Sequence, residues 1–224
     1  MESRYERNIG ALTESEQSEL TRKRVLIAGC GGLGGYIAEY LVRIGITDFT
    51  VCDGDSFDVS NLNRQLNATA RTLGKQKALA AKERLLLINP DAEVKAVCDL
   101  ITEENAFELV SGCDLVIDAL DNVEGRICLE RACEKAGVTF VFGGVNGWFG
   151  SVCTVLPGQR TVEKLFSGLP APKSKSVLCM TVAAVAAYEV AECVKLLLGG
   201  GELIGKMLMI DLKRNTVSTV NIAG

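Results

Sequence analysis

A glycine-rich turn between an apolar run and a helix-forming stretch constrains this chain more than any other feature. The segment VLIAGCGGLGG, residues 25–35, sets its glycines in a G-x-G-G-x-G pattern, formed by Gly29, Gly31, Gly32 and Gly34. Without side chains at a helix start, backbone N–H groups can approach phosphate groups closely, and the helix dipole favours their negative charge. The pattern therefore predicts a strand, a tight turn and a helix that together bind a nucleotide.

Strand-like and helix-like segments alternate through the first two thirds of the chain. The apolar periodicity predicts strands at 24–28, 48–52, 93–98, 114–118 and 138–142, and helices at 32–44, 75–88, 102–110 and 122–137. Such alternation is typical of a parallel sheet with helices on both faces. We therefore expect an α/β fold with a Rossmann-like, doubly wound, mostly parallel sheet. Ligands on such sheets bind outside the carboxyl ends of the strands.

The two ends of the chain add smaller elements to this core. At the amino end, Thr13 and Glu16 have the spacing of a capping box, which predicts a helical arm over residues 1–23. At the carboxyl end, residues 206–222 predict a β-hairpin extension with its turn near 213–215. With 224 residues in all, we expect a single domain over 1–224.

Between the core and the hairpin, residues 157–177 show no clear periodicity and contain the prolines Pro170 and Pro172. We expect a long crossover loop here, because unstructured stretches of this length inside a compact domain are usually functional or disordered. An alanine- and valine-rich helix is predicted to follow, over about 179–198.

Composition excludes several classes of protein and of site. The net charge of −4 argues against a nucleic-acid partner, and no apolar segment approaches the roughly 18 residues of a membrane span. The chain has nine cysteines but no Cys-x-x-Cys pair, so we expect no structural zinc, and reduced thiols are typical of a cytoplasmic protein. It has no histidine. Its chemistry must therefore rely on charge, geometry and metal.

The stretch DGDSFDVSNLNRQ, residues 53–65, distinguishes two kinds of nucleotide site. Asp53 ends a predicted strand, where a carboxylate can accept hydrogen bonds from ribose hydroxyls in a dehydrogenase as well. A dehydrogenase gives no reason for the polar and basic side chains that follow, whereas a chain of phosphates does. These side chains are Asn61, Arg64, Gln65, Lys75 and Lys77, the two lysines at a predicted helix start.

A second acidic segment, DLVIDALDN, places Asp118 and Asp121 at the end of another predicted strand. A carboxylate beside a triphosphate needs a cation between them, and magnesium takes few protein carboxylates. Asp121 is therefore predicted to bind magnesium. Asn122 or Asp121 can also cap the next helix, and Arg126, one turn later, can balance the local charge.

In this order and spacing, these pieces resemble the ThiF/MoeB/HesA family of ubiquitin-activating-enzyme-like adenylyltransferases. The resemblance covers about residues 4–199 and includes RYERN, GCGGLGG, DGDSFDVSNLNRQ, GKQK, DALDN with Arg126, and GGVNGWFGSVCTVLPG. It implies binding of ATP and magnesium, and adenylation of the C-terminal glycine carboxylate of a small ubiquitin-like sulfur-carrier protein ending in Gly-Gly, with release of pyrophosphate.

The resemblance also implies roles for single residues. The glycines Gly29 to Gly34 would cradle the nucleotide, and Asp53 would hold the ribose. Asn61, Arg64 and Lys77 would contact ATP and its phosphates, with Gln65 and Asn122 beside them, and Asp121 would bind magnesium. Arg7, within RYERN, would reach across a homodimer interface to the ATP of the other subunit.

The sequence departs from the family pattern in its cysteines. Many members carry two Cys-x-x-Cys pairs for zinc, and some use a cysteine in or near the crossover loop for a covalent step. Residues 157–177 contain no cysteine, and Cys153 and Cys179 lie just outside them in no recognisable motif. This disfavours a covalent thiol step, and we interpret Cys179 as a core thiol at the start of a helix. The sequence leaves open whether Cys153 or Cys179 forms a covalent intermediate.

Three other functions are weighed against this one. An NAD-dependent oxidoreductase would explain the glycine turn but not Arg64, Lys77 and Asp121. A relative that adenylates a carboxylate on a modified tRNA base would call for a basic surface. A binding module that has lost the reaction would not need the full set of charged residues. The sequence leaves open which carrier, and which of the thiamine, molybdopterin, cysteine or other pathways, is served.

Overall fold

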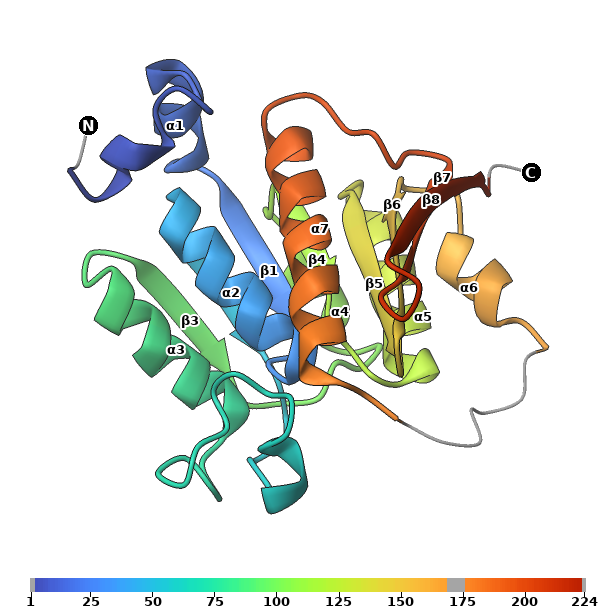
Figure 1. Ribbon diagram of the computed structural model, residues 1–224, viewed down its shortest axis with the longest axis horizontal. Coiled ribbons are helices and arrows are strands. Elements are labelled where there is room, and N and C mark those ends of the chain that lie inside the picture. Colours follow the sequence, from blue (N-terminus) through green and yellow to red (C-terminus); the bar gives the residue numbers. More distant parts are fainter. Residues whose placement is uncertain (1–2, 169–175, 223–224) are drawn as a thin grey trace.

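The computed structural model describes residues 3–168 and 176–222, and its strands there form one eight-stranded sheet (Figure 1). The order is β3-β2-β1-β4-β5-β6-β7-β8. Neighbours from β3 to β5 pair in parallel, and those from β5 to β8 are antiparallel. The strands are β1 (Arg24–Ala28), β2 (Asp48–Cys52), β3 (Glu93–Val97), β4 (Leu115–Asp118), β5 (Phe140–Asn146), β6 (Phe149–Val155), β7 (Lys206–Asp211) and β8 (Thr216–Asn221). The predicted doubly wound sheet with a C-terminal hairpin is confirmed.

Helices cover both faces of this sheet. One apolar core lies under α2, α3 and α7, and a second lies under α4, α5 and α6 on the opposite face. The helices are η1 (Ser3–Asn8), α1 (Glu14–Leu20), α2 (Gly32–Ile44), η2 (Val59–Asn61), α3 (Lys77–Ile88), α4 (Ala106–Val110), α5 (Val123–Ala136), α6 (Thr161–Phe166) and α7 (Cys179–Leu197). No helix in the described ranges is both long and apolar enough to traverse a bilayer.

The order of the sheet reverses between β1 and β4, which pair with each other at its centre. Both strands are almost wholly buried, as expected for parallel strands covered on both sides. The chain leaves β1 toward β2 and β3 on one side, and leaves β4 toward β5 on the other. A crevice at the carboxyl ends of β1 and β4 is therefore the expected ligand site.

Four local predictions need correction. Strand β6 was not predicted, and α6 lies within the stretch expected to be a loop; residues 169–175 of that stretch lie outside the described residues. Helix α4 begins at Ala106 rather than at 102, because residues 103–105 form a turn. Helix α3 begins at Lys77, with Gln76 as its N-cap residue, so Lys75 precedes the helix rather than lying in its first turn.

The amino-terminal arm packs at the amino edge of the sheet, near the C-terminal ends of α2 and α3 (Figure 1). The predicted capping box is present, with reciprocal hydrogen bonds between Thr13 and Glu16. The buried Tyr5 accepts a hydrogen bond from Asn89 Nδ2 at 3.0 Å. The arm is thus fixed to its own subunit on the side away from the carboxyl ends of the strands.

Candidate nucleotide-binding site

The glycine turn is so tight that two of its residues have no room for a side chain. Gly29 has a φ of +98°, and a Cβ there would lie 2.6 Å from the carbonyl oxygen of Ala119. A Cβ on Gly34 would lie 1.8 Å from the carbonyl oxygen of Gly29. Gly31 is the N-cap residue of α2 and provides no side-chain hydrogen bond. The first N–H groups of α2 are therefore open to an anion, as the sequence predicted.

Asp53 is fixed against this turn from the end of β2. Its carboxylate accepts hydrogen bonds from the backbone N–H of Cys30 at 2.7 Å and of Asp55 at 2.9 Å. Burial raises the pKa of Asp53, while these two hydrogen bonds oppose the shift. The side chain thus lies beside the glycine turn, where the sequence places a ribose contact.

Lys77 is a buried cation at the same edge of the sheet. Its Nζ atom lies 2.8 Å from Oδ2 of Asp55, and its backbone N–H donates to the Asp55 carbonyl at 2.9 Å. Asp55 itself is largely exposed. Sequence reasoning missed Asp55, although its position two residues after Asp53 was a usable signal. By contrast, the exposed Lys75 pairs with Glu83 at 3.3 Å, on the outside of α3.

The segment between β2 and α3 brings Gln65 against the glycine turn. A Cβ built on Gly31 would lie 3.5 Å from the Gln65 Nε2 atom. The buried Oε1 atom of Gln65 has no hydrogen-bond partner among the described residues. Asn61 makes a reciprocal cap with Asp58, so it shapes the segment. An orphaned polar atom beside a side-chain-free turn fits a bound nucleotide.

Arg64 lies on the same segment with its guanidinium partly exposed. Its Nη1 atom donates to the carbonyl oxygen of Ser60 and to Oδ1 of Asn63, both at 2.9 Å. Both acceptors are neutral, and no carboxylate of the described residues forms an ion pair with Arg64. A cation of this kind beside the glycine turn suits phosphate oxygens.

The segment after β4 carries Asp121 and Asn122, both exposed. Oδ1 of Asn122 accepts a hydrogen bond from the N–H of Gly125 at 2.7 Å, so Asn122 is the N-cap of α5. Because Gly29 packs on the Ala119 backbone, the glycine turn and this segment are adjacent. The structure therefore brings Asp53, Lys77, Gln65 and Asp121 to one edge of the sheet.

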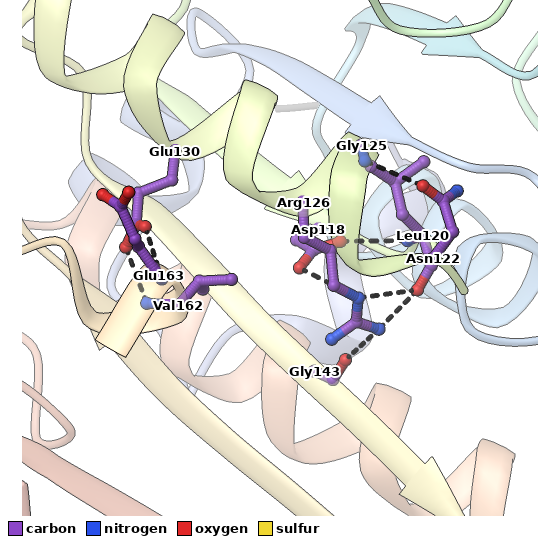
Figure 2. A network of polar contacts seen from close by, with 9 residues as sticks. All are labelled: Asp118, Leu120, Asn122, Gly125, Arg126, Glu130, Gly143, Val162 and Glu163. Carbon is purple, nitrogen blue, oxygen red and sulfur yellow. Dashed lines mark hydrogen bonds and ion pairs between the residues drawn. The ribbon is translucent and has the colours of Figure 1, made fainter. Parts of the chain in front are cut away.

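Beneath this edge lies a buried cluster of three ionisable side chains, Asp118, Arg126 and Glu189. Arg126 reaches from α5 to the ends of β4 and β5, with Asp118 Oδ2 3.7 Å from its Nε atom (Figure 2). Glu189 of α7 approaches from the opposite face of the sheet, where a Cβ on Gly143 would lie 2.3 Å from its carboxylate. Burial, and then the charge of Asp118, raise the pKa of Glu189 well above its usual value. Sequence reasoning did not identify Glu189.

Arg7 is the one predicted site residue that the structure keeps away from the others. It is exposed and lies in η1, at the amino edge of the sheet. Its neighbours Arg4 and Tyr5 bond to Asp91 and Asn89 of the same chain. Arg7 therefore cannot reach the nucleotide site of its own subunit from this position.

The two cysteines that flank residues 157–177 lie in different surroundings. Cys153 is fully buried, and burial raises its pKa to about 12, so its thiolate is not available near neutral pH. Cys179 is exposed at the first turn of α7, which corrects its interpretation as a core thiol. Within 3–168 and 176–222, no three cysteine or acidic side chains are grouped to hold a metal; the expected absence of zinc stays a prediction.

The sequence model of the ThiF family matches residues 5–224, nearly the whole chain. The chain belongs to the ThiF family. This ThiF family protein is 34% identical to the sulfur carrier protein ThiS adenylyltransferase of Bacillus subtilis, with 100% of this chain and 69% of that protein covered. It is 36% identical to the tRNA threonylcarbamoyladenosine dehydratase of Haemophilus influenzae over 149 residues, which cover 64% of this chain and 57% of that protein.

A solved structure of E. coli MccB with ATP has the same fold as this ThiF protein, with a TM-score of 0.84 at 21% identity. The match covers 99% of this chain and 72% of the other. Relatives across the family are named as adenylyltransferases or activating enzymes. The protein is accordingly an adenylyltransferase.

Proposed function

We propose that this protein transfers AMP from ATP to the C-terminal glycine carboxylate of a small ubiquitin-like sulfur-carrier protein. The observation that carries the proposal is the buried ammonium of Lys77, held beside the glycine turn and Asp53. A cation buried at the strand edge where phosphates are expected can stabilise the charge that develops on a triphosphate during nucleotidyl transfer. Several relatives with this activity act, by name, on sulfur carriers.

Each residue at the strand edge has a defined part in this proposal. The N–H groups of the glycine turn bind phosphate oxygens, and Asp53 binds the ribose. Arg64 and Lys77 neutralise the phosphate charge, and Asp121 holds magnesium. Three further side chains contact the nucleotide: Asn61, Gln65 and Asn122. The partner subunit of a homodimer contributes Arg7. Magnesium, when bound, offsets the negative charge of the phosphates.

The chemistry needs no general base. A C-terminal carboxylate is ionised near neutral pH, so it can attack the α-phosphorus directly while the bond to pyrophosphate breaks. The protein has only to hold the carboxylate in line and to stabilise the charge that moves to the leaving group. The absence of histidine from the chain is consistent with this requirement.

Pyrophosphate exchange tests the proposal. The protein is incubated with ATP, magnesium, labelled pyrophosphate and one of several small carrier proteins that end in Gly-Gly. We expect label to enter ATP only when a suitable carrier is present. The matched control is the same carrier without its last two glycines. If none of the carriers supports exchange that requires its terminal glycines, the proposal is overturned.

A carboxylate on a modified tRNA base is a second candidate acceptor, because one relative at 36% identity is named for a tRNA modification. The net charge of −4 disfavours it. Adding bulk tRNA in place of the carrier in the exchange assay distinguishes the two acceptors. Exchange with tRNA alone would replace the carrier proposal.

A further inference from the structure

We propose that Arg126 is a positioning residue, which fixes the segment carrying Asp121 and thereby sets the magnesium-dependent part of ATP binding. The inference rests on the proposed function, because it takes Asp121 to be the magnesium ligand. It concerns a residue that touches neither the nucleotide nor the metal. Its support is the way in which one buried guanidinium holds two backbone carbonyls at the strand ends.

The first of these carbonyls belongs to Leu120, directly before Asp121. Arg126 donates to it from Nε at 3.1 Å and also from Nη2 (Figure 2). The second belongs to Gly143 in β5, which accepts from Nη2 at 3.0 Å. The guanidinium therefore ties the segment after β4 to the neighbouring strand. The direction in which the peptide before Asp121 points is set by these bonds.

The guanidinium is itself held on three sides. Its charge faces the buried carboxylate of Asp118, 3.7 Å away. Its plane lies near the rings of Phe142 and Phe166, whose centroids are 4.7 Å and 5.8 Å from the Cζ atom. Cation–π contacts of this kind restrict the side chain as well as stabilising its charge. Phe166 comes from α6, so the position of Arg126 depends on a helix remote from Asp121.

On its other side, Asp121 is followed by the cap of α5. Oδ1 of Asn122 accepts from the N–H of Gly125, which fixes the peptide after Asp121. Asp121 thus lies between a carbonyl held by Arg126 and an N-cap residue held by its own helix. The backbone of Asp121 is thus fixed on both sides, which limits the directions that its carboxylate can take, as a metal ligand requires.

Lysine is the informative replacement, because it keeps the charge but lacks the planar fork that holds both carbonyls. The affinity for ATP is measured by calorimetry, without carrier, once in excess magnesium and once in EDTA. For the wild type we expect tighter binding with magnesium. We call the ratio of ATP affinity with magnesium to ATP affinity in EDTA the magnesium gain. In Arg126→Lys this ratio should be about tenfold smaller than in the wild type, a typical loss when the residue that orients a metal ligand is changed. Its affinity in EDTA should match the wild type.

Two further variants complete the experiment. Arg131→Lys, on the same helix but exposed and paired with Glu163 at 2.7 Å, should behave as the wild type. Phe166→Leu removes one ring from the guanidinium and touches none of its hydrogen bonds. It should lose part of the magnesium gain, and it decides the question if Arg126→Lys does not fold.

The outcomes separate this inference from the proposed function. If the wild type does not bind ATP, the proposed function fails. If Asp121→Ala keeps the full magnesium gain, Asp121 is not the ligand, and the role of Arg126 falls with it. If Asp121→Ala loses the magnesium gain but a folded Arg126→Lys retains it, only the inference about Arg126 is wrong. If Arg126→Lys does not fold, a full gain in Phe166→Leu leads to the same conclusion.

Discussion

The Oδ2 atom of Asp55 lies 2.8 Å from the Nζ atom of Lys77, and the two residues share a backbone hydrogen bond as well. Lys77 opens α3, where its charge opposes the helix dipole, and its side chain is buried while that of Asp55 is largely exposed. A buried cation at this position is unfavourable without a counter-charge. Asp55 supplies that charge and keeps the ammonium beside the glycine turn.

Replacing Lys77 with Met should therefore remove the charge without leaving a large cavity. We expect the rate of carrier-dependent pyrophosphate exchange to fall on the order of 100-fold, as when one preorganised donor is lost from a dry active site. Lys75→Met, outside the helix, is the matched control and should retain activity. If Lys77→Met exchanged pyrophosphate as fast as Lys75→Met and the wild type, Lys77 would face no phosphate.

Two glutamates on α7 should respond to pH in opposite ways. Glu189 is buried with neither oxygen hydrogen-bonded among the described residues, near Asp118 and Arg126. Its pKa is raised by burial, so the folded protein is destabilised as the pH rises above the unfolded value of 4.5, by at most about 1.4 kcal/mol per pH unit. Glu189→Gln should therefore be more stable than the wild type at pH 7, with the difference shrinking toward pH 4.5.

Glu192, three residues later, is the control. Burial raises its pKa, but contacts with Lys195, the Leu203 N–H and Thr154 outweigh this and lower it. Its contribution to stability is present above pH 4.5 and lost as the pH falls, so Glu192→Gln should destabilise the protein at pH 7 and approach the wild type in acid. Urea unfolding at several pH values measures both differences. Parallel curves for the two variants would contradict the assignment.

A homodimer with shared sites predicts complementation between two inactive variants. Arg7 lies at the edge of the sheet away from Asp121, so only a partner subunit can bring the two together. Arg7→Ala and Asp121→Ala should each be nearly inactive. After subunit exchange, a heterodimer carries both changes in one site and neither in the other, and should recover up to about half of wild-type exchange activity. Exchange of subunits without any recovery would exclude a role for Arg7 across an interface.

Chelation tests the prediction about zinc. The chain has no Cys-x-x-Cys pair, so we expect EDTA or a zinc-specific chelator to leave the melting temperature unchanged. Cys153→Ser, in the core, serves as a positive control for a loss of stability. Stoichiometric zinc found by elemental analysis would require a site assembled from cysteines distant in the sequence.

Local signals in the sequence were sufficient for most of the sheet, the glycine turn and the first helix, because the Gly34 restriction comes from the nearby Gly29 carbonyl and the Thr13 capping box lies within its own helix. Strand β6 was missed although Asn146 and Gly147 precede it, a recognised hairpin signal. The pairing of Asp55 with Lys77 and the approach of Glu189 to Gly143 span 22 and 46 residues of chain. No local pattern specifies such contacts, since they depend on how the helices pack on the sheet.

Helix α6 shows how far such a dependence can extend. Its N-cap residue, Arg160, has a φ of +49° and makes no capping bond, whereas Glu130 of α5 accepts the N–H groups of Val162 and Glu163 at 2.7 Å and 2.8 Å (Figure 2). A helix of six residues does not persist alone in water. Because its first turn is completed by another helix, we expect α6 to be stable only while α5 is in place. The contact of Phe166 with Arg126 therefore depends on Glu130, so loosening α5 near that residue would also loosen this part of the site.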